Sequence, residues 1–452
     1  MDRRIRILLV VVIVVALAYP AAAWVLGMSI ERQWHEQEQL AAQRVPYIEV
    51  VKSDYRRGVY SSTEEVTYSI GGPLPKSVQG QLIVRNAIHH GPLPQLREFA
   101  PATVDTEVVL TPDLRKTLAL ALGTNAGTLT IHTRMKWVGG STTLVKSNAF
   151  HGKGQDGSEI EWRGLDARFD MGSELGTETV DMAAPGLSLK GPAVNVSFAN
   201  LSVKSDIQLA LETLTLGTVH IALDRLEAEQ PAKDLKVTLQ SVVFDTKSSM
   251  NGDYMDSAAT LGTGALQVGK FSASRAFYEQ HFDHLHGPST AALTKAMRTN
   301  AKLAATNSTP ADYSTRFMEA FKTDGVDILV HEPVLSMPRI GFTTPDGELL
   351  VSLKMTAPGI TRADLDVPSQ ALGFALVKHL QGILDVRVDT ALLDKLLDNS
   401  GRGDTITAQM QGLQRQGYIR LDGKALITHL TFLNGQLKVN DLPFPPVPAA
   451  RH

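Results

Sequence analysis

The sequence predicts an α+β, β-rich fold: an N-terminal transmembrane helix, then a long antiparallel, meander-like sheet with a helical insertion and a C-terminal hairpin. Three observations predict it. An uncharged apolar run near the N-terminus is typical of a membrane span. Apolar and polar residues alternate with period two over much of the chain, which is typical of half-buried strands. No helical crossover pattern lies between these strands, which favours antiparallel pairing.

Composition narrows the classes of function. The 452 residues include 44 Lys and Arg against 47 Asp and Glu, so no basic field would attract nucleic acid. The chain has no cysteine, which excludes disulfides, thiolate metal sites and a cysteine nucleophile. It has no glycine-rich phosphate loop ending in Lys-Ser or Lys-Thr, no nucleophile elbow and no kinase motif set. We therefore predict no catalytic activity and no cofactor.

Residues 1–28 are predicted to form a signal anchor. The stretch from Ile7 to Met28 is uncharged and, at roughly 20 residues, is long enough to cross a bilayer core of about 30 Å as a helix. Arg3, Arg4 and Arg6 precede it, and positive charge stays on the cytoplasmic side. The sequence therefore predicts a single-pass protein with the bulk of the chain exported.

A cleaved signal peptide is the alternative to this anchor. Ala21 and Ala23 form an A-x-A-like cleavage site after a shorter apolar core. The apolar run continues past this site through Trp24, a residue suited to the membrane interface, so the uncleaved anchor is favoured. Residues 29–46, rich in Glu and Gln, are predicted to form a stalk helix that leaves the membrane.

Residues 47–270 are predicted to form an antiparallel β-rich region. Leu129, Ile131 and Met135 alternate with polar residues, so one face of that strand is apolar. The same alternation recurs in the segments 194–198, 214–216 and 235–239. The apolar face could be a closed core, covered by a second sheet or by helices, or an open groove that shelters acyl chains.

Residues 271–324 are predicted to be helical, with breaks at prolines. Within them, His281 and His284 are three residues apart, so they would share a helix face as metal ligands do. No H-E-x-x-H pattern accompanies them, and a polar helix face is favoured. A metal-dependent periplasmic hydrolase that uses these two histidines stays open as an alternative.

The C-terminal part, residues 325–442, is predicted to mix strands and helices and to end in a hairpin. A strand is predicted at Val326–Val330. Asp422-Gly423 and Asn434-Gly435 are strong two-residue turn signals between alternating strands. Residues 443–452 form a Pro-rich tail, which is expected to be extended.

Two short motifs resemble those of a known family. "YRRGVYSS" begins at Tyr55, and "HGPLP" begins at His90. With "FMEAF" and the end hairpin "LNGQLKVND", the chain resembles the YdgA-like family of bacterial envelope proteins, which has no established activity. The residues that carry the resemblance are Tyr55, Arg57, Gly58, Ser61, Ser62, His90, Gly91 and Pro92.

The resemblance implies an inner-membrane protein with a large periplasmic part, and no catalytic residues. From the residues themselves, both motifs are expected to shape turns, with Arg57 facing solvent, lipid head groups or a carboxylate, and His90 hydrogen-bonded to backbone. We therefore expect a non-enzymatic envelope binding or scaffolding factor, anchored in the membrane, with lipid or acyl chains as ligand. A structural homo-oligomer, or a partner among envelope proteins, is the other expectation.

Overall fold

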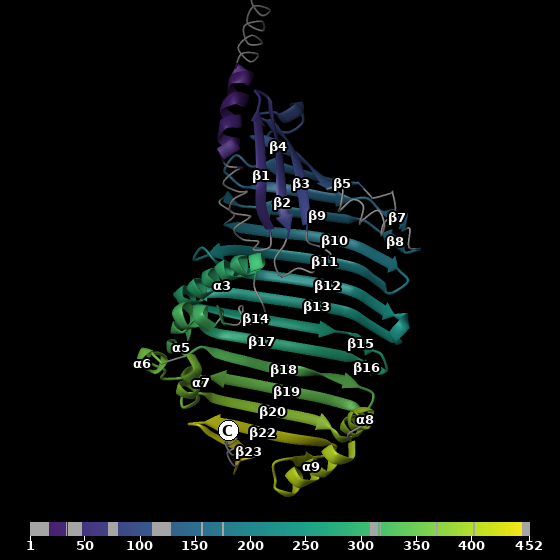
Figure 1. The fold of residues 1–452 in the computed structure, drawn as a ribbon, viewed down its shortest axis with the longest axis vertical. Coiled ribbons are helices and arrows are strands. Elements are labelled where there is room, and N and C mark those ends of the chain that lie inside the picture. The colour runs from purple at the N-terminus through teal and green to yellow at the C-terminus, as the bar shows by residue number, and fades with distance from the viewer. Residues whose placement is uncertain are drawn as a thin grey trace, which may run out of the picture. The chain divides into compact units, whose positions relative to one another are not determined.

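The structure is a computed structural model that describes most of the chain (Figure 1). The chain divides into two compact units. The described residues are 18–32, 34, 48–70, 80–110, 128–154, 157–173, 176–307, 315–316, 318–367, 369–400 and 403–444. Unit 1 comprises Met1–Pro192, Ser202–Leu209 and Arg298–Ser314, and unit 2 comprises Ala193–Leu201, Ala210–Met297 and Thr315–His452.

Unit 1 is built on antiparallel strands. They are β1 (Ile48–Arg57), β2 (Ser61–Ile70), β3 (Gly80–His90), β4 (Ala102–Leu110), β5 (Leu129–Met135), β6 (Ser141–Ser147), β7 (Phe150–Lys153), β8 (Glu159–Trp162), β9 (Leu165–Met171) and β10 (Thr177–Lys190). They pair in the order β1–β2–β3–β4–β5–β6–β9–β10–β8–β7. The first six strands therefore form a meander, as the alternating pattern predicts.

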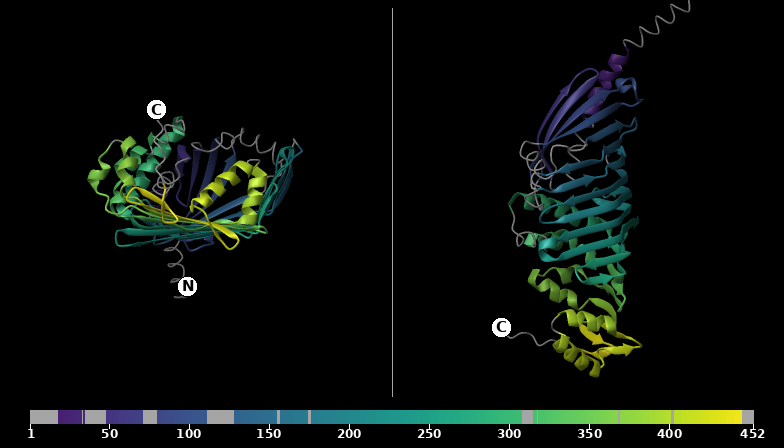
Figure 2. Two further views of the ribbon diagram at one scale, coloured as in Figure 1. Left: turned by 90° about the horizontal axis from the view of Figure 1, so that it is seen from below. Right: turned by 90° about the vertical axis from the view of Figure 1, so that its right-hand side faces the viewer.

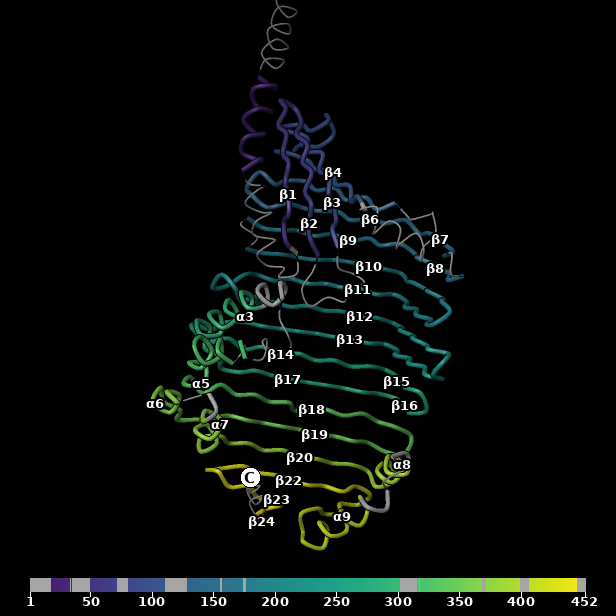
Figure 3. Tube along the Cα trace, in the orientation of Figure 1, coloured from purple at the N-terminus to yellow at the C-terminus, as the bar shows by residue number. Residues whose placement is uncertain are grey.

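Unit 2 is also built on antiparallel strands, several of them longer, which Figure 3 traces from one hairpin to the next. They are β12 (Leu214–Gln230), β13 (Leu235–Asn251), β14 (Tyr254–Thr263), β15 (Ala265–Val268), β16 (Phe271–Ala273), β17 (Arg275–His286), β18 (Val334–Thr344), β19 (Gly347–Thr356), β20 (Gln381–Asp389), β21 (Arg420–Asp422), β22 (Ala425–Leu433), β23 (Gln436–Val439) and β24 (Leu442–Pro443). The main ladder runs β12–β13–β14–β17–β18–β19–β20–β22–β23–β24, all antiparallel. Residues of β11 (Asn195–Ala210) are divided between the units.

The helices of unit 2 lie at the ends of its strands, on one side of the sheet (Figure 2). They are α5 (Asp327–Val330), α6 (Arg362–Leu365), α7 (Ser369–Val377), α8 (Thr390–Ser400) and α9 (Gly403–Arg415). Helix α3 (Gly287–Asn307) follows β17, and its residues are divided between the units. Helices α5 to α7 share a small core around Ile360, Leu365 and Leu372. Turns at Gly423 and at Asn434-Gly435, all with positive φ, close the predicted C-terminal hairpin.

The predicted helix from residue 271 is wrong for Phe271–His286, which form β16 and β17. Strand β17 is paired on both sides, with β14 and with β18. Its apolar residues Tyr278, Phe282 and Leu285 lie at i, i+4 and i+7, a spacing that also fits a helix face. A β-bulge at His284, whose φ is 61°, adds one residue and breaks the strand alternation, which produces the misleading period.

The predicted strand at Val326–Val330 is also wrong, because Asp327–Val330 form α5. A short apolar run does not distinguish a strand from a buried helix by period alone. The apolar side chains of α5 pack instead into the helical core beside Leu365 and Leu372.

The N-terminal prediction lies largely outside the described residues. Over the part of the chain that the structure describes, no helix is long and apolar enough to cross a membrane. The predicted span starts at Ile7, whereas the structure describes a helix over residues 18–32 and at residue 34. This described helix, hereafter the N-terminal helix, belongs to unit 1.

Candidate functional site

The N-terminal helix packs on one face of the unit 1 sheet. Ala23, Gly27 and Ile30 lie at i, i+4 and i+7, so they share one helix face, and all three are buried. Ile30 enters a core cluster with Ile88, Ala102, Val104 and Met135. The part of the predicted stalk that the structure describes therefore does not stand clear of the protein but completes the core of unit 1.

The "YRRGVYSS" motif forms the β1–β2 turn beside this helix. The Gly58 N–H donates to the Ser61 carbonyl at 2.9 Å, and a Cβ on Gly58 would lie 2.6 Å from that oxygen, so only glycine fits. Arg57 pairs with Glu31 of the helix at 3.0 Å, and its guanidinium carbon lies 4.5 Å from the centroid of the Trp24 ring. Of the expected partners of Arg57, the carboxylate is the one observed.

His90 links the two motifs to the helix. Its Nδ1 lies 3.0 Å from the Val59 carbonyl, which can only accept, so Nδ1 donates and Nε2 accepts from the Ser62 hydroxyl at 2.8 Å. Both side chains are buried. A Cβ built on Gly27 would lie 2.6 Å from the His90 ring, which shows how closely the helix lies on the imidazole. His90 is hydrogen-bonded to backbone, as expected, and also holds the helix position.

Gly91 and Pro92 continue the site into the β3–β4 loop. The Gly91 N–H donates to the Pro101 carbonyl at 2.6 Å, and a Cβ on Gly91 would lie 2.0 Å from the Ala100 carbonyl oxygen. The peptide between Gly91 and Pro92 is cis. The motif residues thus come together in one place: Tyr55 packs against the core cluster, and Ser61 closes the turn that Gly58 begins.

Burial makes the histidine site sensitive to acid. Burial lowers the pKa of His90 below the ordinary histidine value of 6.5. At neutral pH both the folded and the unfolded states are neutral at this residue. As the pH falls through about 6.5 the unfolded state takes up the proton first, so the free energy of unfolding falls until the folded-state pKa is reached.

We therefore expect unit 1 to lose stability as the pH falls below about 7, by at most about 1.4 kcal/mol per pH unit from this group. Urea unfolding can be followed by tryptophan fluorescence, because every tryptophan lies in unit 1: Trp24, Trp34, Trp137 and Trp162. The variant His90→Gln should show a smaller pH dependence than the parent. An unchanged pH dependence in that variant would contradict the assignment of the acid sensitivity to His90.

A buried polar network, absent from the sequence-based predictions, lies below the helix. Glu64 is 2% exposed, and its Oε2 accepts from Trp34 Nε1 at 2.6 Å and from Asn86 Nδ2 at 2.8 Å. Thr106 Oγ1 donates to Asn86 Oδ1 at 2.7 Å. A glutamate at an inward position of a strand, between the buried Ser62 and Val66, is the sequence signal that could have revealed this network.

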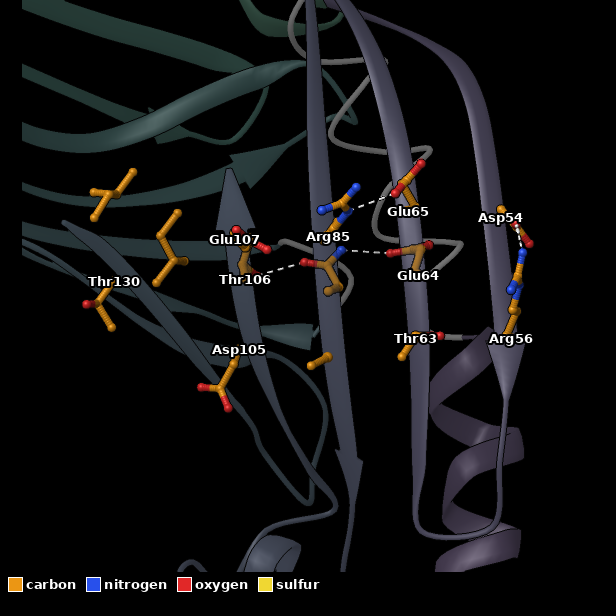
Figure 4. A pocket seen from close by; sticks show the side chains of 14 residues that line it. Asp54, Arg56, Thr63, Glu64, Glu65, Arg85, Asp105, Thr106, Glu107 and Thr130 are labelled. Carbon is orange, nitrogen blue, oxygen red and sulfur yellow. Dashed lines mark hydrogen bonds and ion pairs between the residues drawn. The ribbon is translucent and has the colours of Figure 1, made fainter. Parts of the chain in front are cut away.

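The opposite face of β1 to β5 is polar and concave. A cavity of about 650 Å³ lies there, and most of its lining residues are charged or polar (Figure 4). Glu64, Asn86 and Thr106 of the buried network are also among its lining residues. Arg85 pairs with Glu65 at 2.8 Å and Arg56 with Asp54 at 2.9 Å. These pairs are well exposed, and such pairs contribute at most about 1 kcal/mol each. The cavity is therefore a solvated, mainly acidic surface, with five carboxylates and two arginines among its lining residues, and with no arrangement of these side chains that marks an acid-base pair.

The two histidines of the alternative metal site do not share a helix face. His281 Nε2 lies 2.9 Å from Glu279 Oε1, and His284 Nδ1 lies 2.9 Å from the His331 carbonyl across the bulge. In the described segments no group of three or more His, Cys, Asp or Glu side chains is arranged to hold a metal ion. The spacing of His281 and His284 suggested shared metal ligation only if residues 281–284 were helical, and they belong to strand β17.

Unit 2 carries an apolar face of a different kind. Residues directly opposite each other on neighbouring strands share a face, and the pairing register places one row across β12 to β20. The row, which we call the apolar row, consists of Ile221, Phe244, Leu261, Tyr278, Ile340, Val351 and Val386.

No side chain of the apolar row is buried, and Leu261 is 41% exposed. In unit 1 the equivalent inward side chains Ile88 and Val104 are 0% exposed, because the N-terminal helix covers them. The contrast indicates that the described residues leave the apolar row of unit 2 without a full covering layer.

Comparison with other proteins identifies the family and nothing finer. Comparison with curated proteins and comparison with solved structures each give no match to this chain. A family model described as "Bacterial protein of unknown function (DUF945)" matches residues 1–447, and the chain therefore belongs to this bacterial family.

Proposed function

We propose that the chain is a non-enzymatic, lipid-binding factor of the bacterial cell envelope, anchored by its N-terminus in the inner membrane with both units in the periplasm. The observation that carries the proposal is the partly exposed apolar row of unit 2. The proposed ligand is an acyl chain, lying across the strands.

The dimensions of the row suit such a ligand. Seven side chains on seven neighbouring strands, at about 4.8 Å per strand, give a length of about 29 Å. Two acyl chains end to end make up a bilayer core of about 30 Å, so the row can accommodate at least one. Tyr278 contributes the row's only hydroxyl, which suits an apolar ligand without directional polar groups.

The anchor is supported by the sequence and by the packing of the N-terminal helix. The uncharged run and its three preceding arginines support an uncleaved, N-in span. Cleavage after Ala23 would cut the N-terminal helix within its buried face, because Ala23 is 0% exposed and Ile30, beyond the cut, is 2% exposed. This packing favours retention of the segment over its removal as a signal peptide.

The test is photo-crosslinking of the full chain in bacterial membranes with a fatty acid or phospholipid that carries a photoreactive acyl chain. We expect cross-links to peptides of β17 to β20. The variant Val351→Asp should reduce them strongly, because a carboxylate on the apolar row has no partner there. Leu350→Asp is the matched control, since Leu350 is the adjacent residue, points to the other face and lies opposite Arg387.

Equal cross-linking in the parent and in both variants, or none in the parent, would reject the lipid ligand. A second copy of the chain is the other occupant that could cover an apolar sheet face. Sedimentation of the detergent-solubilised chain separates these outcomes, because a dimer that Val351→Asp dissociates and Leu350→Asp does not would favour the homo-oligomer.

A further inference from the structure

Unit 1 exposes large apolar side chains at one end of its strands. They come from three turns, β1–β2, β3–β4 and β5–β6, which follow strands that run in the same direction. We call them the apolar rim: Tyr60, Leu93, Leu96, Phe99, Trp137 and Val138. Leu96 is 79% and Val138 89% exposed, which is a marked cost for side chains of this size in water.

The rim is held in place by packing and backbone geometry. The rings of Phe99 and Trp137, from two different turns, lie with centroids 4.9 Å apart. Gln95 and Leu96 have φ of 49° and 59°, a left-handed conformation that is disfavoured for residues with a Cβ. The loop therefore adopts a strained conformation around a leucine that it leaves in solvent, a combination typical of a binding surface.

The first described turn of the N-terminal helix lies at this rim. The Tyr19 hydroxyl donates to the Leu93 carbonyl at 2.7 Å, and the Tyr19 ring stacks on Tyr60 with centroids 6.1 Å apart. Residues 7–17, which directly precede the helix, are uncharged and apolar. The predicted membrane-spanning segment therefore leaves unit 1 at the apolar rim.

The length of that segment places the rim in the membrane. Residues 7–17 number eleven, and even as a helix at about 1.5 Å per residue they would cover only about 16 Å of a bilayer core of about 30 Å. Residues from Ala18 onward must supply the rest, and these are packed on unit 1. The outer face of the helix suits this role, because Trp24, Val25 and Met28 are exposed.

We propose that the apolar rim inserts into the interfacial region of the same bilayer, so that unit 1 binds the lipid surface directly as well as through its anchor. Tyrosine and tryptophan are the residues that membrane interfaces favour, and Tyr19, Tyr60 and Trp137 supply them here. The Arg57–Glu31 ion pair lies beyond the apolar part of the helix. In the proposed arrangement this pair lies on the aqueous side of the interface. This inference rests on the proposed anchor but not on the proposed lipid ligand of unit 2.

The absence of cysteine from the chain makes the test direct. Leu96→Cys in the full chain is labelled with an environment-sensitive fluorophore, and the protein is reconstituted into vesicles of phosphatidylethanolamine and phosphatidylglycerol. Lipids with brominated acyl chains then report contact of the label with the hydrophobic layer. Leu129→Cys is the matched control, because Leu129 is 45% exposed in the same unit at the far end of β5.

We expect several-fold stronger quenching of the Leu96→Cys label than of the Leu129→Cys label. If the chain floats with the vesicles and both labels are quenched equally weakly, the anchor stands and the insertion of the rim is rejected. If the chain does not float with the vesicles, the anchor and the rim are both rejected. Strong quenching at position 96 supports the rim even where the acyl cross-links in unit 2 fail.

Discussion

Replacing Glu64 with alanine is expected to lower the free energy of unfolding of unit 1 by about 2 to 4 kcal/mol. The buried carboxylate accepts from Trp34 Nε1 and from Asn86 Nδ2. Its removal leaves two donors without their acceptor and opens a gap below the N-terminal helix. For a unit of this size we expect the melting temperature, followed by tryptophan fluorescence, to fall by about 5 to 15 °C.

Glu65→Ala is the matched control, because the two glutamates are neighbours in sequence and lie on opposite faces of β2. Glu65 makes an exposed ion pair with Arg85, so its loss should change stability by no more than about 1 kcal/mol. Equal destabilisation by the two substitutions would contradict the assigned role of the network and would point to a general intolerance of β2.

Replacing Gly27 with leucine is expected to displace the N-terminal helix from unit 1. A Cβ at this position already comes within 2.6 Å of the His90 ring, and that ring is fixed by hydrogen bonds to Val59 and Ser62. Because the imidazole cannot move freely, the helix must lift and expose Ile30. We expect a loss of about 3 kcal/mol or more, from overpacking and from lost burial.

Trypsin provides the measurement. Arg32 is exposed on the docked helix, where helical backbone protects the peptide bond from cleavage. In Gly27→Leu the cleavage rate at Arg32 should rise by about tenfold for each 1.4 kcal/mol lost. Val25→Leu adds the same side chain at an exposed position of the same helix and should leave the rate unchanged. A rate in Gly27→Leu equal to that of the control would mean that the helix is not held by this contact.

Antiparallel, meander-like pairing was predictable from the sequence because it depends on local alternation. Segments such as Leu129–Met135 show period two clearly, and no helical crossover pattern lies between them. The full strand order was not predictable, because β6 pairs with β9 and β14 pairs with β17 rather than with the next strand along the chain. The same rule failed at β17, where the bulge at His284 changes the apolar spacing to one that fits a helix. Pairing with β14 and β18 makes residues 275–286 a strand rather than a helix, and such long-range pairing is not visible in a short window of sequence.

The candidate site was less predictable, because its parts are distant in the chain. The motifs at Tyr55 and at His90 are easy to find in the sequence. Their common partner is the N-terminal helix, and the sequence does not indicate this contact. In that helix, Gly27 lies within an apolar run without helical periodicity and Ile30 lies just after it, so no pattern marks the buried face. Hydropathy alone predicts that the whole run lies in lipid, whereas the structure packs Ala23 and Gly27 of this run against unit 1.

The strands at the C-terminal end of unit 2 become progressively shorter, from 9 residues in β22 to 4 in β23 and 2 in β24. The last strand of the described residues also contains Pro443, which has no N–H to donate to a further neighbour. A long unpaired edge would recruit strands from other molecules, and short edge strands with proline are a common protection against this. The tapered end therefore limits growth of the sheet by edge-to-edge aggregation, a hazard for any protein built on so long a ladder of exposed, partly apolar strands.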